Sequence, residues 1–338
     1  MDHGVQYRHL HLSFAAPGVL EVRLNRPHKR NAFDARHWQE LGHAFARVIP
    51  RMRKARCVLL TGAGPIFSAG IDLASMAGGI GGAVTAGISI GDGEADEEEE
   101  EEDAVVARAA AVLREGGYWQ ASWKALSDCR KPVVCAIQGG CYGAALELVC
   151  YADVRFCTRN CVFAAPEVDL GFAADIGGNQ LFPKIVGNQS YVRELQLSGR
   201  TFGADEALRM GLVSRILPGA DELRAASCAL AESIAKKSPV ATMGVKTMLN
   251  YARDHSLEDS LAFSLTWNAA MIQTRDTARA GMAFVTKTEA VFPDAPVLVK
   301  DASDNNDGVA PGSSEDEEAA GQPQQGRKKK TTETKAKL

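Results

Sequence analysis

The pattern of apolar and polar positions along the chain predicts an α/β protein in which short strands alternate with helices. Residues 19–24 alternate as a strand, and residues 34–48 carry helical periodicity behind Asp34, a favourable N-cap. Apolar or β-rich runs predict further strands at residues 55–61, 133–137, 153–157 and 161–164. Strands that alternate with helices need crossover connections, so we expect a largely parallel sheet.

Helical periods dominate the second half of the chain. A helix is predicted at residues 104–126, and another begins around Tyr142 or Gly143. Beyond residue 191 the pattern is helical as far as residue 285, with interruptions at residues 199–203, 211–219 and Ser238-Pro239. The stretch 239–288 is rich in Ala, Met and Leu, and we expect it to lie against a neighbouring subunit.

Two segments depart from this globular pattern. Residues 77–103 pass from a Gly/Ala-rich run into an acidic run, which predicts a disordered surface insert. An acidic run can bind basic partners, but a solvated, self-repelling loop is favoured, and we assign it no function. From residue 293 polar residues replace the apolar periodicity, so residues 293–338 are predicted to be a disordered tail.

The tail ends in Ala336-Lys337-Leu338, which resembles the S-K-L peroxisomal address with Ala in place of Ser. A flexible tail is what a receptor needs in order to capture a carboxyl terminus. We therefore expect binding to a peroxisomal import receptor, and a location in a peroxisome or a peroxisome-like organelle such as a glycosome. The cytoplasm and the mitochondrion are the alternatives.

Composition narrows the class of protein. The 338 residues are 46% hydrophobic and 24% charged, enough for one large core or two modest ones, and the net charge of −4 does not favour nucleic acid as a partner. Eight cysteines occur without a CxxC pair or a nearby His pair, so we expect buried thiols and no metal site. The chain shows no signal-peptide pattern and no run of ~20 apolar residues. We expect a soluble protein of a reducing compartment, without a membrane span.

Two turns rich in small residues offer uncovered backbone N–H groups. Residues 67–73 follow the strand that ends near Thr61-Gly62, and residues 138–145 follow a buried strand and open a helix. Free N–H groups and the helix dipole attract negative charge there, so the two turns can form an oxyanion hole. Dinucleotide sites and tight packing use similar glycines, but the spacing here is not G-x-G-x-x-G.

Three acidic residues lie among apolar or small neighbours. Glu147 comes three residues after Ala144 and shares its helix face, and Glu167 and Asp175 follow in similar surroundings. Taken singly, each acid could be a cap or a salt-bridge partner, and Asp175 could be a helix N-cap. Carboxylates that share a desolvated cleft raise at least one pKa, so together they suit proton transfer near neutral pH.

Four ordered segments, at residues 24–32, 67–73, 139–148 and 165–171, resemble those of the enoyl-CoA hydratase/isomerase (crotonase) superfamily. The resemblance covers roughly residues 8–292 without the insert. It implies the crotonase (ClpP-like) α/β fold, with repeated ββα units that form two roughly perpendicular sheets over residues 1–76 and 104–237. A helical trimerisation region at residues 238–292 would follow, giving a homotrimer or hexamer.

The same resemblance implies an acyl-CoA substrate and no cofactor, because coenzyme A is part of the substrate. Two backbone N–H groups, those of Ile71 and Ala144, would form the oxyanion hole. The residues that the resemblance places against the substrate or its CoA are Lys29, Arg30, Ala32, Ala69, Gly70, Ile71, Asp72, Leu73 and Ala145.

Glu147 and Glu167 occupy the positions of the two glutamates with which hydratases add water to an enoyl-CoA. Residues 171–177 instead resemble the corresponding stretch of the Δ3,5-Δ2,4-dienoyl-CoA isomerases of fatty acid beta-oxidation, and Asp175 is then the distinguishing acid. The isomerase pattern has Asp at the position of Glu147 and Gly at those of Ala144 and Ala145. That departure allows residual hydratase activity or a shifted chain-length preference.

The isomerase resemblance implies that Glu167 is the base at C2 and Asp175 the acid at C6, two roles that could be exchanged. Glu147 would polarise the site or bind water. One alternative is an enoyl-CoA hydratase that uses Glu147 and Glu167. Another is a non-catalytic crotonase-fold protein that binds RNA or a scaffold partner, which the acidic balance of the chain and the three acids disfavour.

Overall fold

The larger of two sheets contains six strands in the order β1-β2-β3-β4-β6-β9. The structure, a computed structural model, describes residues 5–76 and 97–296. After an antiparallel β1–β2 hairpin, all other neighbours in this sheet are parallel, as predicted. Its strands are β1 (Leu10–Ala16), β2 (Val19–Leu24), β3 (Cys57–Gly62), β4 (Val133–Ile137), β6 (Val154–Thr158) and β9 (Arg215–Leu217).

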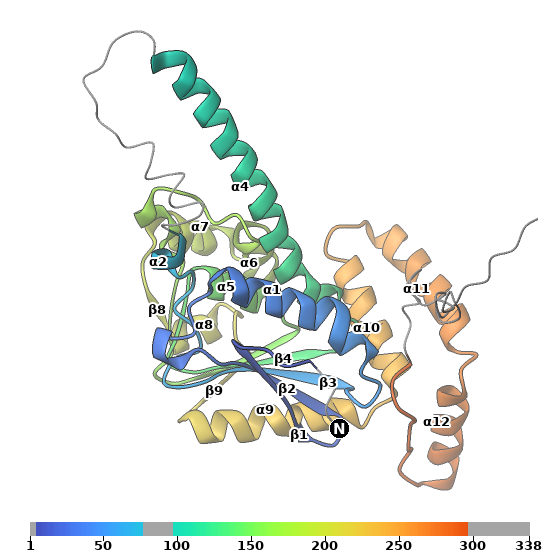
Figure 1. The fold of residues 1–338 in the computed structure, drawn as a ribbon. Helices are drawn as coiled ribbons and strands as arrows, with labels where there is room; N and C mark the ends of the chain where they lie inside the picture. The colour runs from blue at the N-terminus through green and yellow to red at the C-terminus, as the bar shows by residue number, and fades with distance from the viewer. Residues whose placement is uncertain (1–4, 77–96, 297–338) are drawn as a thin grey trace, which may run out of the picture. The chain divides into compact units, whose positions relative to one another are not determined.

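Helices cover both faces of this sheet because alternate side chains of its strands point in opposite directions. Cys57 and Leu59 of β3 belong to the apolar cluster beneath α9 (Ala220–Ala235), whereas Val58 and Leu60 belong to the larger core on the other face. Figure 1 shows α9 along one face of the sheet and α1 on the other. Continuous burial of β3 and β4 follows from this arrangement.

On the α1 side, aromatic rings join the helices to the core. Helix α1 (Ala35–His43) begins at Asp34, whose side chain accepts a hydrogen bond from the His37 N–H, as the predicted cap requires. Trp38 of α1 stacks on Trp123 of α4 (Glu97–Asp128) with ring centroids 3.7 Å apart. The short helices of this half are the 3-10 helices η1 (Pro27–Lys29) and η3 (Ile49–Arg51), the π-helix η2 (Ala44–Val48) and the α-helix α2 (Leu73–Met76).

A second sheet of three short strands lies at the ends of the main strands, in agreement with the predicted two-sheet architecture. Its strands, in the order β5-β7-β8, are β5 (Gly140–Tyr142), β7 (Val162–Ala164) and β8 (Phe202–Gly203). Between and after them come η4 (Pro166–Leu170), α5 (Ala144–Cys150), α6 (Gly178–Val186), α7 (Gln189–Ser198) and α8 (Ala204–Arg209). The predicted start of α5 was within two residues of the observed one.

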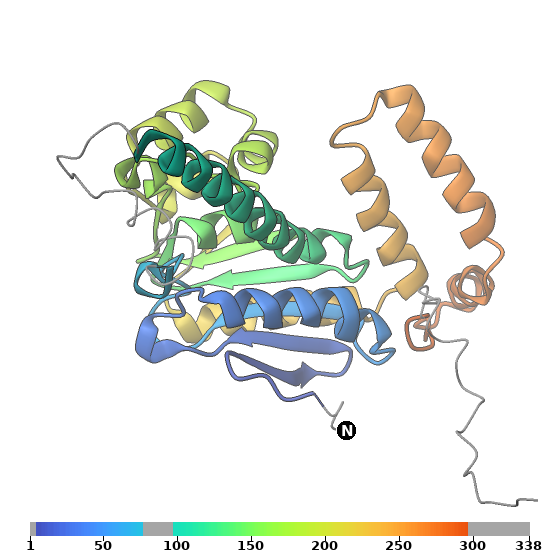
Figure 2. The ribbon, with the colours of Figure 1, turned by 45° about the horizontal axis from the view of Figure 1, so that its top comes forward.

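The predicted C-terminal helical stretch consists of three helices, α10 (Pro239–Tyr251), α11 (Leu257–Met271) and α12 (Arg275–Thr286), drawn in orange shades in Figures 1 and 2. Buried Lys246 of α10 donates to the carbonyl oxygens of Leu126 and Lys131 and pairs with Asp153 at 2.9 Å, which ties α10 to the core. No residue of α11 is buried in this chain.

Two predicted boundaries were wrong. Helix α4 begins at Glu97, so residues 97–103, the end of the predicted insert, are helical; acidic residues are favourable in a first helical turn because they face the positive end of the helix dipole. The remainder of the insert, residues 77–96, lies outside the described residues. The start of the predicted tail is also structured, because Ala295 is buried and its N–H donates to the Arg53 carbonyl.

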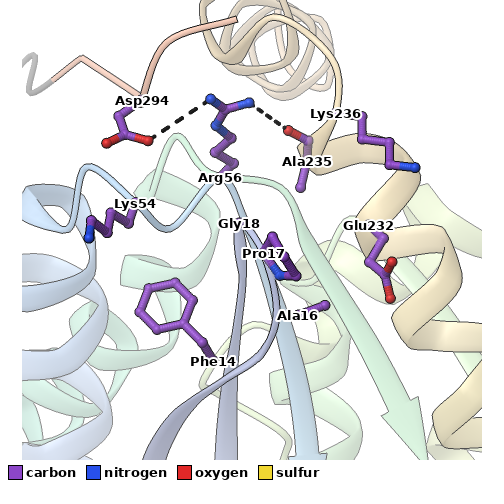
Figure 3. A pocket seen from close by; sticks show the side chains of 10 residues that line it. All are labelled: Phe14, Ala16, Pro17, Gly18, Lys54, Arg56, Glu232, Ala235, Lys236 and Asp294. Carbon is purple, nitrogen blue, oxygen red and sulfur yellow. Dashed lines mark hydrogen bonds and ion pairs between the residues drawn. The ribbon is translucent and has the colours of Figure 1, made fainter. Parts of the chain in front are cut away.

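Arg56 holds that C-terminal segment against the core (Figure 3). Its guanidinium donates to the carbonyl oxygens of Ala235 and Phe292 and lies 4.0 Å from the Asp294 carboxylate. A cavity of about 540 Å³ opens beside it, at the amino end of β3. The carboxyl ends of the parallel strands, where α/β proteins bind ligands, are at the other end of the sheet. The rest of the tail, residues 297–338 with the C-terminal tripeptide, lies outside the described residues.

Candidate active site

The two predicted turns lie side by side at the carboxyl ends of β3 and β4. Ser68 and Cys141 form a parallel bridge, and the Ser68 N–H donates to the Gly140 carbonyl. The turns can approach closely because Gly70, at φ +85°, has no Cβ. A Cβ at this position would lie 2.5 Å from the backbone carbonyl oxygen of Tyr142. The fold therefore brings residues 67–73 and 139–145 together.

On each turn, the N–H group expected at the oxyanion hole has no backbone acceptor among the described residues. Phe33 pairs with Ile71 through the Gly70 carbonyl and the Asp72 N–H, so the N–H of Ile71 itself points away from that bridge. Ala144 is the first residue of α5, and the first N–H groups of a helix have no acceptor within it. These are the two groups that were expected to form the oxyanion hole.

Asn31 organises the first turn, and sequence reasoning did not single it out. It is fully buried at φ +54°, and its side-chain amide donates to the carbonyl oxygens of Ala63, Ile66 and Phe67. Its own carbonyl accepts from the Ser68 hydroxyl at 2.8 Å. The sequence placed Asn31 in the segment 24–32 of the family resemblance, next to the basic pair Lys29-Arg30, but neither feature identifies a buried residue that holds a turn.

Some of the residues predicted to contact CoA are exposed, whereas others are paired with a neighbouring residue or buried. Lys29 and Arg30 are exposed beside the first turn, where the Arg30 carbonyl accepts from the Ala69 N–H. The Asp72 carboxylate is engaged by Arg26 at 2.6 Å; burial acts to raise its pKa, but the Arg26 hydrogen bond and charge outweigh burial and lower it. Ala145 lies in the core with no exposed surface.

Glu167 lies on the η4 turn with its carboxylate against the start of α5. A Cβ on Gly143 would lie 3.0 Å from its Oε1, so the carboxylate is next to the Ala144 N–H end of the helix. Both carboxylate oxygens are buried and have no hydrogen-bond partner among the described residues. Burial and the charge of Asp175 raise the pKa of Glu167. Such a group is poised to bind or release a proton.

Glu147, on α5, is equally buried, but one of its carboxylate oxygens is hydrogen-bonded. Its Oε2 accepts hydrogen bonds from the backbone N–H groups of Ile176 at 3.1 Å and Gly178 at 2.6 Å. Burial, assisted by the charges of Glu167 and Asp175 and opposed by these N–H groups, raises the pKa of Glu147 to about 8. Glu147 is therefore largely protonated at neutral pH.

Asp175 lies on the segment between η4 and α6, and its side chain is exposed into a cavity of about 500 Å³ that Tyr151 and Gly177 also line. Partial burial raises the pKa of Asp175. The interpretation of Asp175 as an N-cap was wrong, because the N-cap of α6 is Gly177. The structure thus brings the three predicted acids within electrostatic reach of one another.

Among the described residues, no cluster of three or more His, Cys, Asp or Glu side chains is placed to hold a metal ion. The eight cysteines are free thiols, and all but the half-buried Cys228 are buried. No helix in the described part of the chain has the length and apolar character to cross a membrane.

Comparison with known proteins identifies the family. The family model described as enoyl-CoA hydratase/isomerase matches residues 15–88 and 98–295. The chain belongs to this family. The resemblance drawn from its four motifs is thereby confirmed.

Within the family, the chain is 40% identical over 290 residues to the mitochondrial Delta(3,5)-Delta(2,4)-dienoyl-CoA isomerase of Rattus norvegicus, covering 86% of this chain and 82% of the relative. It is 32% identical to the peroxisomal Delta(3,5)-Delta(2,4)-dienoyl-CoA isomerase of Arabidopsis thaliana, with 81% and 92% covered. The solved enoyl-CoA hydratase of Bacillus anthracis superposes with a TM-score of 0.70 at 24% identity, over 85% of this chain and 99% of that one, which supports the fold.

Proposed function

We propose that this protein isomerises 3,5-dienoyl-CoA to 2,4-dienoyl-CoA in fatty acid beta-oxidation by carboxylate-mediated proton transfer. The observation that carries the proposal is the Glu167 carboxylate, which is buried without a hydrogen-bond partner among the described residues, lies beside the start of α5 at Ala144 and feels the charge of Asp175. Identity to relatives named for this reaction supports the substrate class.

Binding follows from the two turns. The exposed Lys29 and Arg30 would meet the phosphates of CoA, and the thioester oxygen would accept hydrogen bonds from the N–H groups of Ile71 and Ala144. These donors matter most when negative charge develops on that oxygen, and each such contact contributes about 3–4 kcal/mol to the stability of the transition state.

The reaction moves two double bonds by one position each. Ionised Glu167 removes a proton from C2, which the carbonyl and the diene acidify, and the electrons form a dienolate whose charge rests on the thioester oxygen. Protonated Asp175 then gives its proton to C6, so the C3 and C5 double bonds become C2 and C4 double bonds. The raised pKa values of both acids allow one to be protonated while the other is ionised.

The second candidate is an enoyl-CoA hydratase in which Glu147 and Glu167 handle water. The observation in its favour is that both glutamates are buried, and that Glu167 is close enough for its charge to add to the effect of burial in raising the pKa of Glu147. Against it, the Oε2 of Glu147 already accepts from two backbone N–H groups.

The two candidates are separated by offering the purified protein a 3,5-dienoyl-CoA and, separately, a 2-enoyl-CoA. An isomerase produces the longer-wavelength absorbance of a conjugated 2,4-dienoyl thioester from the first substrate. A hydratase removes the conjugated absorbance of the second and leaves the first unchanged. A binding protein changes neither.

We also propose that α10–α12 form the contact surface of a homotrimer or hexamer. In the single chain these helices expose large apolar side chains that would be covered by another copy, among them Val245, Leu249, Leu257, Leu261, Leu265, Met282, Phe284 and Val285.

The proposed location is a peroxisome or a related organelle, reached through Ala336-Lys337-Leu338. The names of relatives give both organelles: the isomerase of Arabidopsis thaliana is named peroxisomal and that of Rattus norvegicus mitochondrial.

A further inference from the structure

The short segment from Ala174 to Gly178 contains Asp175. Side chains from α4, from the C-terminal end of α5 and from α6 hydrogen-bond to its backbone. Gln120 of α4 donates to the Asp175 carbonyl at 2.7 Å, and the Tyr151 hydroxyl donates to the Ile176 carbonyl at 3.0 Å. Asn179 of α6 donates to the Ala174 carbonyl at 2.7 Å. These bonds take up carbonyl oxygens and leave the N–H groups of the segment to another partner.

Glu147 is that partner, because its single Oε2 accepts from the N–H groups of both Ile176 and Gly178. The N-cap of α6, Gly177, has no side chain with which to satisfy the first N–H groups of that helix. Glu147 therefore caps α6 from a different helix, α5, in which it lies three residues after Ala144.

Close packing enforces the arrangement. An added Cβ on Gly178 would lie 2.8 Å from the Cγ of Glu147, and one on Gly177, at φ +123°, would lie 2.2 Å from the Tyr151 hydroxyl. The backbone on either side of Ile176 is thus pressed against α5 and its C-terminal end. A shift of Glu147 would shift the backbone that carries Asp175.

We propose that Glu147 is a positioning residue for Asp175: its side-chain oxygen, used as a hydrogen-bond acceptor, sets where the C6 acid lies, and it transfers no proton itself. The inference rests on the proposed isomerase function. It distinguishes Glu147, whose Oε2 has two donors, from Glu167, whose two oxygens have none among the described residues.

The test compares Glu147→Gln with Glu147→Leu in the full-length protein. The glutamine keeps an oxygen acceptor but cannot exchange a proton, whereas the leucine has no acceptor. We expect Glu147→Gln to lose less than about tenfold in isomerase kcat, since a proton-transferring group contributes roughly 100-fold or more. Glu147→Leu should lose about 100-fold, the effect of a displacement near 1 Å, with KM for the dienoyl-CoA little changed.

Tyr151→Phe provides a second variant that removes another tether of the same segment and leaves all three acids in place. It should lower kcat in the same direction as Glu147→Leu while circular dichroism shows a folded protein. The inference is overturned if Glu147→Gln is as impaired as Glu147→Leu, because an exchangeable proton is then required, or if Glu147→Leu retains wild-type kcat. Failure of the wild type to isomerise any 3,5-dienoyl-CoA would instead overturn the proposed function.

Discussion

Glu147, Glu167 and Asp175 all carry a carboxyl group, but the three groups lie in different surroundings. Glu147 accepts hydrogen bonds from backbone N–H groups, the oxygens of buried Glu167 have no partner in the part of the chain that the structure describes, and Asp175 is exposed in a cavity. Apolar neighbours in the sequence indicated that all three are unusual. They could not show which carboxylate is engaged, because the donors on Ile176 and Gly178 are about thirty residues away from Glu147 along the chain.

The buried Glu147 predicts a pH-dependent stability difference. Its pKa is raised from 4.5 to about 8, so between these values the folded protein keeps a proton that the unfolded chain releases. The free energy of unfolding of the wild type should therefore fall, relative to that of Glu147→Gln, as pH rises through this window. Urea denaturation of both proteins at pH 5 and pH 8 measures the difference.

Glu206→Gln is the matched control. The hydrogen bond from Arg200 lowers the pKa of Glu206, so this group is ionised in both the folded and unfolded states across most of the same window. The difference in free energy of unfolding between Glu206→Gln and the wild type should stay nearly constant between pH 5 and pH 8. If the difference in free energy of unfolding between Glu147→Gln and the wild type is equally constant, the raised pKa of Glu147 is contradicted.

At the scale of elements, the sequence predicted four of the five strands with five or more residues, and it also predicted the short β7, but it missed β1 (Leu10–Ala16). The runs at residues 19–24 and 133–137 are long enough to show a strand pattern, and they became β2 and β4. Strands β5 and β8 contain only two or three residues, one of them inside a Gly-rich turn, so no periodicity could reveal them. The Gly-rich turn before α5 was nevertheless predicted, because its glycines and the following helix mark it.

The close approach of the two turns predicts the effect of Gly70→Ala. The new Cβ would lie 2.5 Å from the Tyr142 oxygen and would strain a residue at φ +85°, so the turns should separate and the N–H groups of Ile71 and Ala144 lose their alignment. We expect lower stability and a fall in kcat of about 100-fold. Thermal melting and steady-state kinetics measure both.

The control is Gly117→Ala on the exposed face of α4, where nothing lies within 4 Å of an added Cβ. There alanine should stabilise the helix by about 0.5–1 kcal/mol and leave the kinetics unchanged. Equal behaviour of the two variants would mean that the turns do not depend on Gly70.

At the scale of the whole molecule, the C-terminal helices present the largest departure from an ordinary monomer surface. Leu265 and Phe284 are 74% and 86% exposed, and no residue of α11 is fully buried within its own chain. The sequence predicted this region as helical and as a subunit contact, since its Ala, Met and Leu content exceeds what a solvent-facing helix needs.

A charged residue in this surface should weaken assembly. Leu265→Lys would place an unpaired charge among apolar side chains, so sedimentation velocity should show a smaller species than the wild type at the same concentration. The neighbouring Thr266→Lys, at an exposed polar position, should retain more of the assembly. A monomeric wild type, or equal assembly of all three proteins, would contradict the proposed surface.

The central claim is that Asp175 and Glu167 move a proton across a dienoyl thioester, and Asp175→Asn tests it most directly. The measurement is the rate at which ultraviolet absorbance of a 2,4-dienoyl-CoA appears when wild type and variant are given the same 3,5-dienoyl-CoA. We expect rapid formation with the wild type and a loss of at least about 100-fold with Asp175→Asn, which should still bind the CoA ester. Isomerisation by Asp175→Asn at the wild-type rate would contradict the account.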